Sequence, residues 1–166
     1  MTIREANAGD IHLLVKVADE VWEKTYRHIV TPLQIQVMMQ DMHTSEAYQK
    51  QMKTGDRFFL AMEGAEILGF ISFHPRITAD ESIMRIPKLY IRFSAQGTGS
   101  GKALLQQVEE EAARQGLQYL ELNVNRYNKA LYFYRKNGFF IHRSENLDYK
   151  GFPLNDYVMR RKVVFE

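Results

Sequence analysis

The stretch that decides the fold runs from Leu89 to Leu105 and reads LYIRFSAQGTGSGKALL. A strand leads into a loop with glycines at every second position, and that loop opens a helix. Glycines let backbone N–H groups turn towards one point, and a helix N-terminus adds roughly half a positive charge there. The stretch therefore predicts an anion site that suits a phosphate group.

Two familiar phosphate loops fit this stretch poorly. A P-loop needs glycine at position 96 and serine or threonine at position 103, where the chain has Gln96 and Ala103. A dinucleotide-binding loop needs glycine at position 102, which is Lys102, and its acidic partner would be Glu121, inside the next predicted strand. Neither nucleotide-binding pattern is supported.

A third pattern, Gln/Arg-x-x-Gly-x-Gly/Ala, is matched in full by Gln96, Gly99 and Gly101. A second motif follows on the next predicted helix, where residues 128–139 read NKALYFYRKNGF and match Asn-x-Ala-x-x-x-Tyr-x-x-x-Gly-Phe. With these two motifs, and in the order of elements from about residue 2 to residue 164, the sequence resembles the GCN5-related N-acetyltransferase (GNAT) family. The family often has Pro-Glu where this chain has Phe93-Ser94, a departure that affects loop stiffness.

The resemblance implies a mixed α/β fold, with a twisted, mostly antiparallel sheet whose central strands splay apart and are flanked by helices. It also implies that acetyl-CoA is the cosubstrate. Its pantetheine arm would pair with the backbone of Leu89, Tyr90 and Ile91, because pantetheine amides can satisfy an opened strand. The loop would hold the pyrophosphate through Gln96, Gly97, Thr98, Gly99, Ser100, Gly101 and Lys102.

Two further residues take roles from the second motif. Tyr134 stands where the family keeps its general acid, although a core tyrosine is the alternative interpretation. Because a tyrosine titrates near 10 and a thiol near 8.5, full proton transfer is uphill by roughly 2 kcal/mol. We therefore expect Tyr134 to donate a hydrogen bond to the leaving sulfur. Asn128 is predicted to contact the cofactor, to cap its helix, or both.

The acceptor site is predicted on the N-terminal helices, at Trp22 and Tyr26. The surrounding sequence is loosely similar to bacterial polyamine and small-amine N-acetyltransferases, whereas a lone tryptophan on an apolar face is more often part of the core. An amine must lose a proton before it attacks. His74, Asp80 and Glu81 are the candidate bases, and no motif selects among them.

Hydrophobic periodicity predicts one α/β domain over residues 1–166. Asn7 and Asp10 form a predicted capping box for the first helix, Thr31-Pro32 starts the second, and Ser45 caps the third. The later elements are strands at 57–62, 66–74 and 83–93, a helix at 101–115, a strand at 118–124, a helix at 128–137, and strands at 139–143 and 157–164.

Composition excludes several classes of protein. The chain has 166 residues, a formal charge of +2 and no cysteine, which excludes disulfides, zinc–thiolate sites and cysteine nucleophiles. No His-x-x-x-His pair suggests a metal site, and no apolar stretch is long enough for a membrane span. The start of the chain lacks a signal-peptide pattern, so the predicted location is cytoplasmic. The basic run Arg160–Lys162 is interpreted as the solvated side of a terminal or edge strand, with no nucleic-acid partner.

The predicted function is transfer of an acetyl group from acetyl-CoA to a primary amine. Direct attack in a ternary complex is favoured, since no nucleophile for an acyl-enzyme stands out. The acceptor is a small molecule, such as a polyamine, or a peptide amine, and formation of a homodimer is left open. The alternative is a sensor module that binds acetyl-CoA without catalysis; a nucleotide-phosphate enzyme ranks third.

Overall fold

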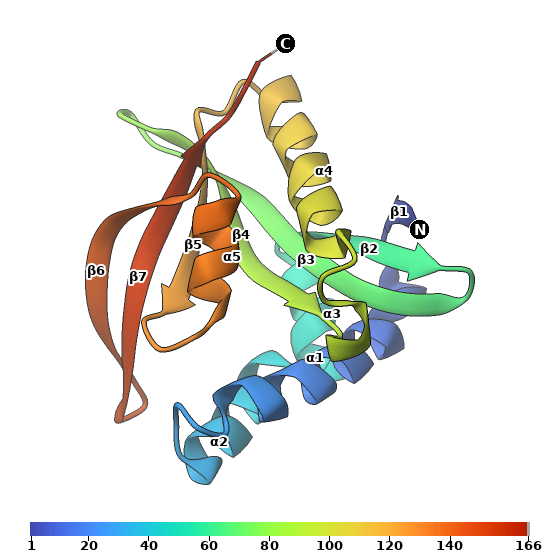
Figure 1. The fold of residues 1–166 in the computed structure, drawn as a ribbon, viewed down its shortest axis with the longest axis vertical. Helices are drawn as coiled ribbons and strands as arrows, with labels where there is room; N and C mark the ends of the chain where they lie inside the picture. Colours follow the sequence, from blue (N-terminus) through green and yellow to red (C-terminus); the bar gives the residue numbers. More distant parts are fainter. Residues whose placement is uncertain (166) are drawn as a thin grey trace. The chain divides into compact units, whose positions relative to one another are not determined.

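The computed structural model describes residues 1–165 and is a mixed α/β fold (Figure 1). In chain order its elements are β1 (Thr2–Glu5), η1 (Ala8–Asp10), α1 (Ile11–Tyr26), α2 (Pro32–Met42), α3 (Ser45–Lys53), β2 (Arg57–Glu63), β3 (Glu66–Ile77), β4 (Ser82–Ile91), η2 (Phe93–Ala95), α4 (Ser100–Arg114), β5 (Tyr119–Asn125), α5 (Ala130–Lys136), β6 (Phe140–Tyr149) and β7 (Phe152–Lys162). Here η marks a short 3-10 turn. The order of helices and strands confirms the predicted fold class.

The strands pair in the order β1-β2-β3-β4-β5-β7-β6. The pairs β1–β2, β2–β3, β5–β7 and β6–β7 are antiparallel, whereas β4 and β5 are parallel. Within the described residues, the β4–β5 pairing covers only Ile83–Arg85 with Tyr119–Glu121, although both strands continue. The mostly antiparallel sheet is therefore as predicted, and pairing of its central strands stops early.

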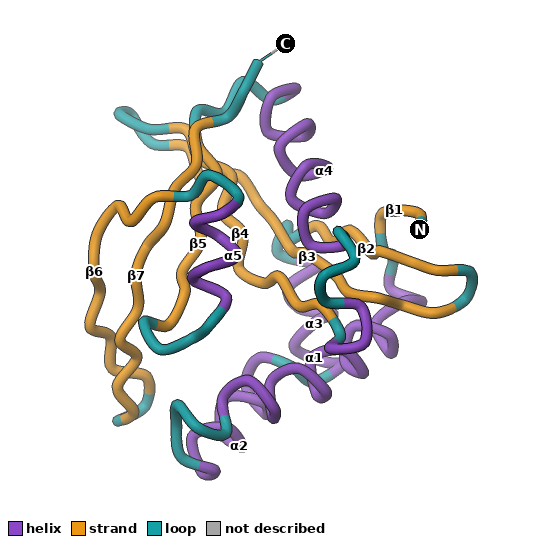
Figure 2. Tube along the Cα trace, in the orientation of Figure 1, coloured by secondary structure: helices purple, strands orange, loops and turns teal. Residues whose placement is uncertain are grey.

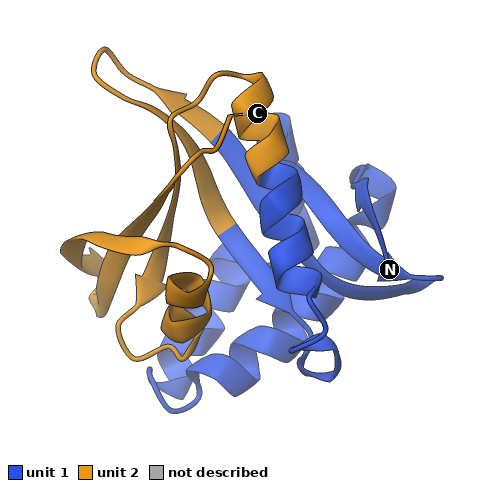
Figure 3. Cartoon of the chain, turned by 45° about the horizontal axis from the view of Figure 1, so that its top comes forward, with its two compact units in different colours: residues 1–74, 88–108 blue, residues 75–87, 109–166 orange. Residues whose placement is uncertain are grey.

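Contacts divide the chain into two compact units (Figure 3). Unit 1 comprises residues 1–74 and 88–108, and unit 2 comprises residues 75–87 and 109–166. Unit 1 holds the N-terminal helices and the glycine loop, whereas unit 2 holds α5 and the β6–β7 hairpin. The prediction of a single domain over 1–166 stays a prediction, and its last residue, Glu166, lies outside the described residues.

Side chains cap η1, α2 and α3, whereas α1 has no side-chain cap of its own. Asn7 accepts a hydrogen bond from Gly9 N and Asp10 accepts one from Asn7 N, which completes the predicted capping box at η1. Thr31 caps α2 at Gln34 N, again as predicted. The prediction for α3 was wrong by one residue, because Thr44, not Ser45, accepts from Ala47 N.

Three other boundaries also differ from the sequence prediction. The strand expected to reach Phe93 ends at Ile91, because Phe93–Ala95 forms η2. The helix expected at residues 101–115 spans Ser100–Arg114 instead. The helix expected from residue 128 starts at Ala130, because the Asn128 side chain accepts from Ala130 N in a turn before it.

The two last strands are longer than predicted and form one continuous hairpin (Figure 2). The loop expected around Lys150–Pro153 is a tight turn, in which Lys150 has φ +50° and Gly151 has φ +87°. Positive φ at both positions matches the right-handed twist of the flanking strands. Pairing therefore continues to Tyr149 and Phe152.

The interpretation of Arg160–Lys162 as the solvated side of a terminal or edge strand was wrong for Arg160, although Lys162 is exposed. β7 lies between β5 and β6 in the sheet, and Arg160 is only 4% exposed. Its guanidinium donates to Glu121 Oε2 at 2.7 Å and to both carboxylate oxygens of Glu81 at 2.9 and 3.0 Å. Arg160 thus supplies a cationic partner for Glu121, a fully buried carboxylate of unit 2.

Candidate functional site

The glycine loop of unit 1 has the backbone geometry that an anion site needs. Gly97 has φ +80° and Gly99 has φ +90°, a left-handed conformation that strongly favours glycine. The first N–H to bond within α4 belongs to Ala103 and reaches Gly99 O at 3.0 Å. Helix geometry therefore leaves the N–H groups of the three residues after Gly99 without an intrahelical acceptor.

The loop is tied to the end of β4. Gln96, the first residue of the loop motif, donates from Nε2 to Ile91 O at 3.2 Å. Thr98 and Ser100 share a hydroxyl–hydroxyl hydrogen bond of 2.9 Å, and Ser100 is buried at the start of α4. Lys102 is exposed on the first turn of α4. The predicted pyrophosphate-binding residues thus lie together on one loop and the helix turn that follows it.

The strand segment predicted to pair with pantetheine is part of the same unit. Leu89, Tyr90 and Ile91 form the C-terminal end of β4 and are each partly exposed. This end lies beyond the last β4–β5 pair, Arg85 with Glu121. Pro87, which has no N–H to donate, comes just after that pair.

The two residues from the second motif belong to unit 2. Tyr134 on α5 is 7% exposed, and its ring packs edge-on against Phe133 and Phe139 at centroid distances of 5.4 and 5.7 Å. The Asn128 side chain accepts from Ala130 N at 2.9 Å in the turn before α5, but the N-cap residue of that helix is Lys129. Their predicted contacts with the cofactor stay predictions.

The residues predicted to hold the acceptor lie in an aromatic cluster of unit 1. Trp22 is only 5% exposed and stacks on Tyr26 at a centroid distance of 4.2 Å. Its ring also faces His43 at 5.2 Å, and its Nε1 donates to the Tyr90 hydroxyl at 2.9 Å. Tyr26 is partly exposed. The surface available to an acceptor is therefore on Tyr26 rather than on Trp22.

The three candidate bases lie in different environments. His74 Nδ1 lies 2.9 Å from Asp56 Oδ1 in unit 1. Glu81 in unit 2 forms the paired hydrogen bonds with Arg160, which hold its pKa below the ordinary value and make it a weaker base. Asp80 is exposed in the turn between β3 and β4. The ion pair with Arg160 disfavours Glu81 as the general base, so that His74 and Asp80 are the remaining candidates.

Two buried titratable groups in unit 1 were not expected from the sequence. Lys88 on β4 is 8% exposed and donates to Gln51 Oε1 at 2.8 Å; burial lowers its pKa to about 8. His43 is 2% exposed, lies 2.9 Å from the Tyr48 hydroxyl, and has its pKa lowered by burial to about 3. No sequence pattern predicts the burial of Lys88 or His43, because it depends on contacts with residues of α3, Gln51 and Tyr48.

Glu121 is engaged in ion pairs rather than free for a ligand. It is fully buried on β5 and accepts from Arg76, Arg85 and Arg160 at 2.9, 2.8 and 2.7 Å. These guanidinium groups outweigh the effect of burial and lower its pKa. In a dinucleotide-binding site this carboxylate would accept a hydrogen bond from a ribose hydroxyl. Here it accepts hydrogen bonds from three arginines of the protein instead.

Within residues 1–165, no group of three or more histidine, aspartate or glutamate side chains is placed to hold a metal ion. Nor is any helix in this part of the chain both long and apolar enough to cross a membrane.

Comparison with the sequences of known proteins identifies a family. The family model of the acetyltransferase (GNAT) domain matches residues 26–161. An uncharacterized N-acetyltransferase of Mycobacterium tuberculosis is 36% identical over 89 residues, which are 53% of this chain and 57% of that protein. The match thus spans little more than half the length of this curated relative.

Solved structures give a longer match. The PaiA N-acetyltransferase from Thermoplasma acidophilum, in complex with coenzyme A, has a TM-score of 0.78 and 25% identity, with 98% of this chain and 99% of that chain covered. The ribosomal-protein-S18-alanine N-acetyltransferase from Escherichia coli has a TM-score of 0.71 at 14% identity, over 99% and 95% of the two chains. The second likeness concerns the fold alone.

Proposed function

Since this chain belongs to the GNAT family of acetyltransferases, we propose that it transfers the acetyl group of acetyl-CoA to a primary amine. The observation that carries the proposal is the glycine loop between β4 and α4. Two glycines in the left-handed conformation precede a helix start whose first N–H groups have no intrahelical acceptor. A pyrophosphate is the ligand such a loop suits best, and the similar PaiA protein is in complex with coenzyme A.

The loop residues Gln96–Lys102 would bind the pyrophosphate mainly through backbone N–H groups, since these are what the glycines expose. Leu89–Ile91 would pair with the pantetheine amides, because this end of β4 continues beyond its pairing with β5. Asn128 would contact the cofactor in addition to capping its turn. The loop Gln96–Lys102 and the strand end Leu89–Ile91, both in unit 1, form the proposed cofactor site.

The proposed reaction is a direct transfer. The amine nitrogen attacks the thioester carbonyl carbon, so that a C–N bond forms and the carbonyl oxygen gains negative charge. The Ile91 N–H would donate to that oxygen. The C–S bond then breaks, Tyr134 donates a hydrogen bond or its proton to the departing sulfur, and the ammonium proton leaves to a base or water.

For the acceptor we propose a small amine, with a polyamine or a peptide amine as narrower candidates. Tyr26 is the proposed contact, because it is partly exposed and stacks on the buried Trp22. A homodimer, a cytoplasmic location and a single domain over 1–166 also stay predictions.

The alternative function is a sensor that binds acetyl-CoA without acetyl transfer. A thiol-release assay with acetyl-CoA and a panel of amines separates the two functions, with binding measured in parallel by calorimetry. The proposed function predicts binding together with amine-dependent thiol release. Tight binding without release for any amine would favour the sensor, and tighter binding of ATP than of CoA would favour a nucleotide enzyme.

A further inference from the structure

We propose that Trp22 on α1 is a positioning residue, which holds the cofactor-binding end of β4 through the hydroxyl of Tyr90. This inference rests on the proposed function, in which the backbone of residues 89–91 pairs with pantetheine. It assigns to Trp22 a role in cofactor binding rather than in contact with the acceptor.

The first observation is the packing of the Tyr90 side chain. Trp22 Nε1 donates to the Tyr90 hydroxyl at 2.9 Å. The Tyr90 ring meets the ring of His43 edge-on at a centroid distance of 5.6 Å and that of Phe70 at 5.5 Å, nearly perpendicular. Tyr90 is therefore held by α1, by β3 and by the residue that follows α2, all within unit 1.

The second observation is the backbone of β3 beside Tyr90. A register shift between β2 and β3 leaves Leu68 as an extra residue, the pattern of a β-bulge. The next residue, Gly69, lies so close to β4 that a Cβ there would meet Tyr90 O at 2.5 Å and the Cα of Ile91 at 3.0 Å. The glycine thus permits a close approach that fixes the backbone of β4 at these positions.

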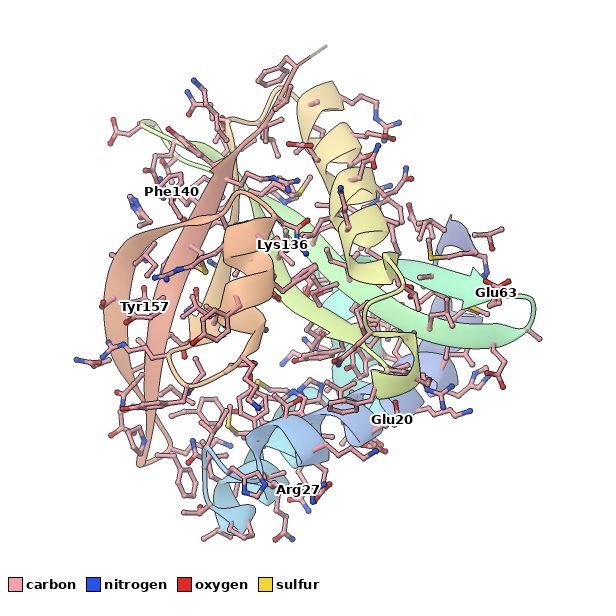
Figure 4. All side chains as sticks on the ribbon, viewed as in Figure 1. Glu20, Arg27, Glu63, Lys136, Phe140 and Tyr157 are labelled. Atoms are coloured by element: carbon pink, nitrogen blue, oxygen red, sulfur yellow. The ribbon has the colours of Figure 1, made fainter. Side chains whose placement is uncertain are left out.

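A second side-chain contact between α1 and the end of β4 is made by Arg92, just after the strand. Arg92 donates from Nε to Glu20 Oε2 at 3.2 Å, and Glu20 lies on α1 (labelled in Figure 4). The Arg92 N–H also donates to Leu68 O at 2.9 Å. The segment 90–92 is therefore anchored to α1 by two side chains and to the bulge of β3 by its backbone.

The contacts of Tyr90 and Arg92 with α1 matter for the proposed reaction because the N–H and C=O groups of one strand cannot shift independently of each other. Pantetheine pairs with Leu89–Ile91 only if the strand presents its N–H and C=O groups at the right spacing, and a small displacement weakens every contact together. Trp22 is 5% exposed and its N–H is already used. Positioning is thus the role that its contacts support.

A double-mutant cycle tests the inference. Trp22→Phe and Tyr90→Phe each remove one partner of the hydrogen bond and keep an aromatic ring. Each variant should raise the dissociation constant of acetyl-CoA about 3- to 10-fold, as expected for the loss of one neutral hydrogen bond, and the double variant should add little to either. The KM for the acceptor should stay unchanged in Tyr90→Phe.

Tyr48→Phe is the matched control. Tyr48 is also buried in this cluster and its hydroxyl lies 2.9 Å from His43 Nδ1, but it does not belong to β4. This variant should lower the melting temperature and leave acetyl-CoA affinity unchanged, when affinity is measured well below that temperature. A merely structural role for Trp22 predicts the same pattern for Trp22→Phe and would contradict the inference.

Other outcomes are equally decisive. If Trp22→Phe raised the acceptor KM, and its effect multiplied with that of Tyr90→Phe, Trp22 would be a substrate contact and the inference would be wrong. Failure of the proposed function is seen separately in the unmodified protein, which would then show no acetyl-CoA binding in calorimetry, or binding without amine-dependent thiol release.

Discussion

Tyr134 is a buried residue whose hydroxyl has a proposed role in the reaction. Its side chain packs against Phe133 and Phe139, so a phenylalanine at this position keeps the packing. Negative charge gathers on sulfur only as the C–S bond breaks. A hydrogen bond to sulfur therefore stabilises the transition state more than the bound substrate.

Tyr134→Phe should lower kcat roughly 10- to 1,000-fold, while acetyl-CoA affinity stays near that of the unmodified protein. Thiol release measures kcat, and calorimetry measures affinity. Tyr132→Phe is the control, because Tyr132 lies on the same helix and is 70% exposed. Full turnover by Tyr134→Phe would show that water or another donor handles the leaving thiolate.

The glycine at position 99 is also tested at the residue scale. Gly99→Ala should weaken acetyl-CoA binding about tenfold or more, because an alanine disfavours the left-handed conformation that directs the loop N–H groups. Gly116→Ala is the control. Gly116 follows the other end of α4 with φ +73°, against +90° for Gly99, and a Cβ at either position meets no atom within 4 Å. Equal loss of affinity in both variants would contradict a specific role for the loop.

At the scale of an element, β5 depends on the ion pairs of Glu121. The carboxylate is fully buried and receives three guanidinium groups from β3, β4 and β7, all from unit 2. Removing its charge leaves Arg160 buried beside a neutral group. Glu121→Gln should lower the free energy of unfolding by about 3 kcal/mol, near the low end for a broken buried pair because Arg76 is partly exposed. Urea denaturation measures this, and the exposed Glu110→Gln should change it by less than about 0.5 kcal/mol.

The same ion pairs predict a pH dependence of stability. The arginines lower the pKa of Glu121 in the folded state. Its stabilising contribution is therefore complete above the ordinary glutamate pKa of about 4.3, and is lost as the pH falls through the lowered value. The stability difference between the unmodified protein and Glu121→Gln should shrink below about pH 4 in urea titrations from pH 3 to 7. A difference that stayed constant over this range would exclude linkage to this carboxylate.

At the scale of the whole molecule, a ligand that binds only the folded chain raises its melting temperature. Acetyl-CoA at 100 times its dissociation constant should add about 2.7 kcal/mol, which for a chain of this size raises the melting temperature by about 5 to 11 °C. Differential scanning fluorimetry measures the shift, with ATP at the same concentration as the comparison. A larger shift with ATP would contradict acetyl-CoA as the cosubstrate.

Much of the fold could be predicted from the sequence because the relevant interactions are local. The caps at Asn7 and Thr31 depend on side chains that reach backbone groups three residues away at most. The glycine loop was found because a left-handed backbone favours one residue type. These features depend only on interactions between residues that are close together in the chain.

Only the tertiary structure decided which polar groups are buried and paired. The sequence suggested that Arg160–Lys162 lies on the solvated side of a terminal or edge strand. In the structure β7 lies inside the sheet, and Arg160 contacts Glu121, which is 39 residues away in the sequence. The sequence allowed Trp22 to be an acceptor contact or a core residue, and only the structure shows that its N–H donates to Tyr90, 68 residues away. Pairings of this kind depend on which strands and helices become neighbours, and hydrophobic periodicity along the chain does not encode that choice.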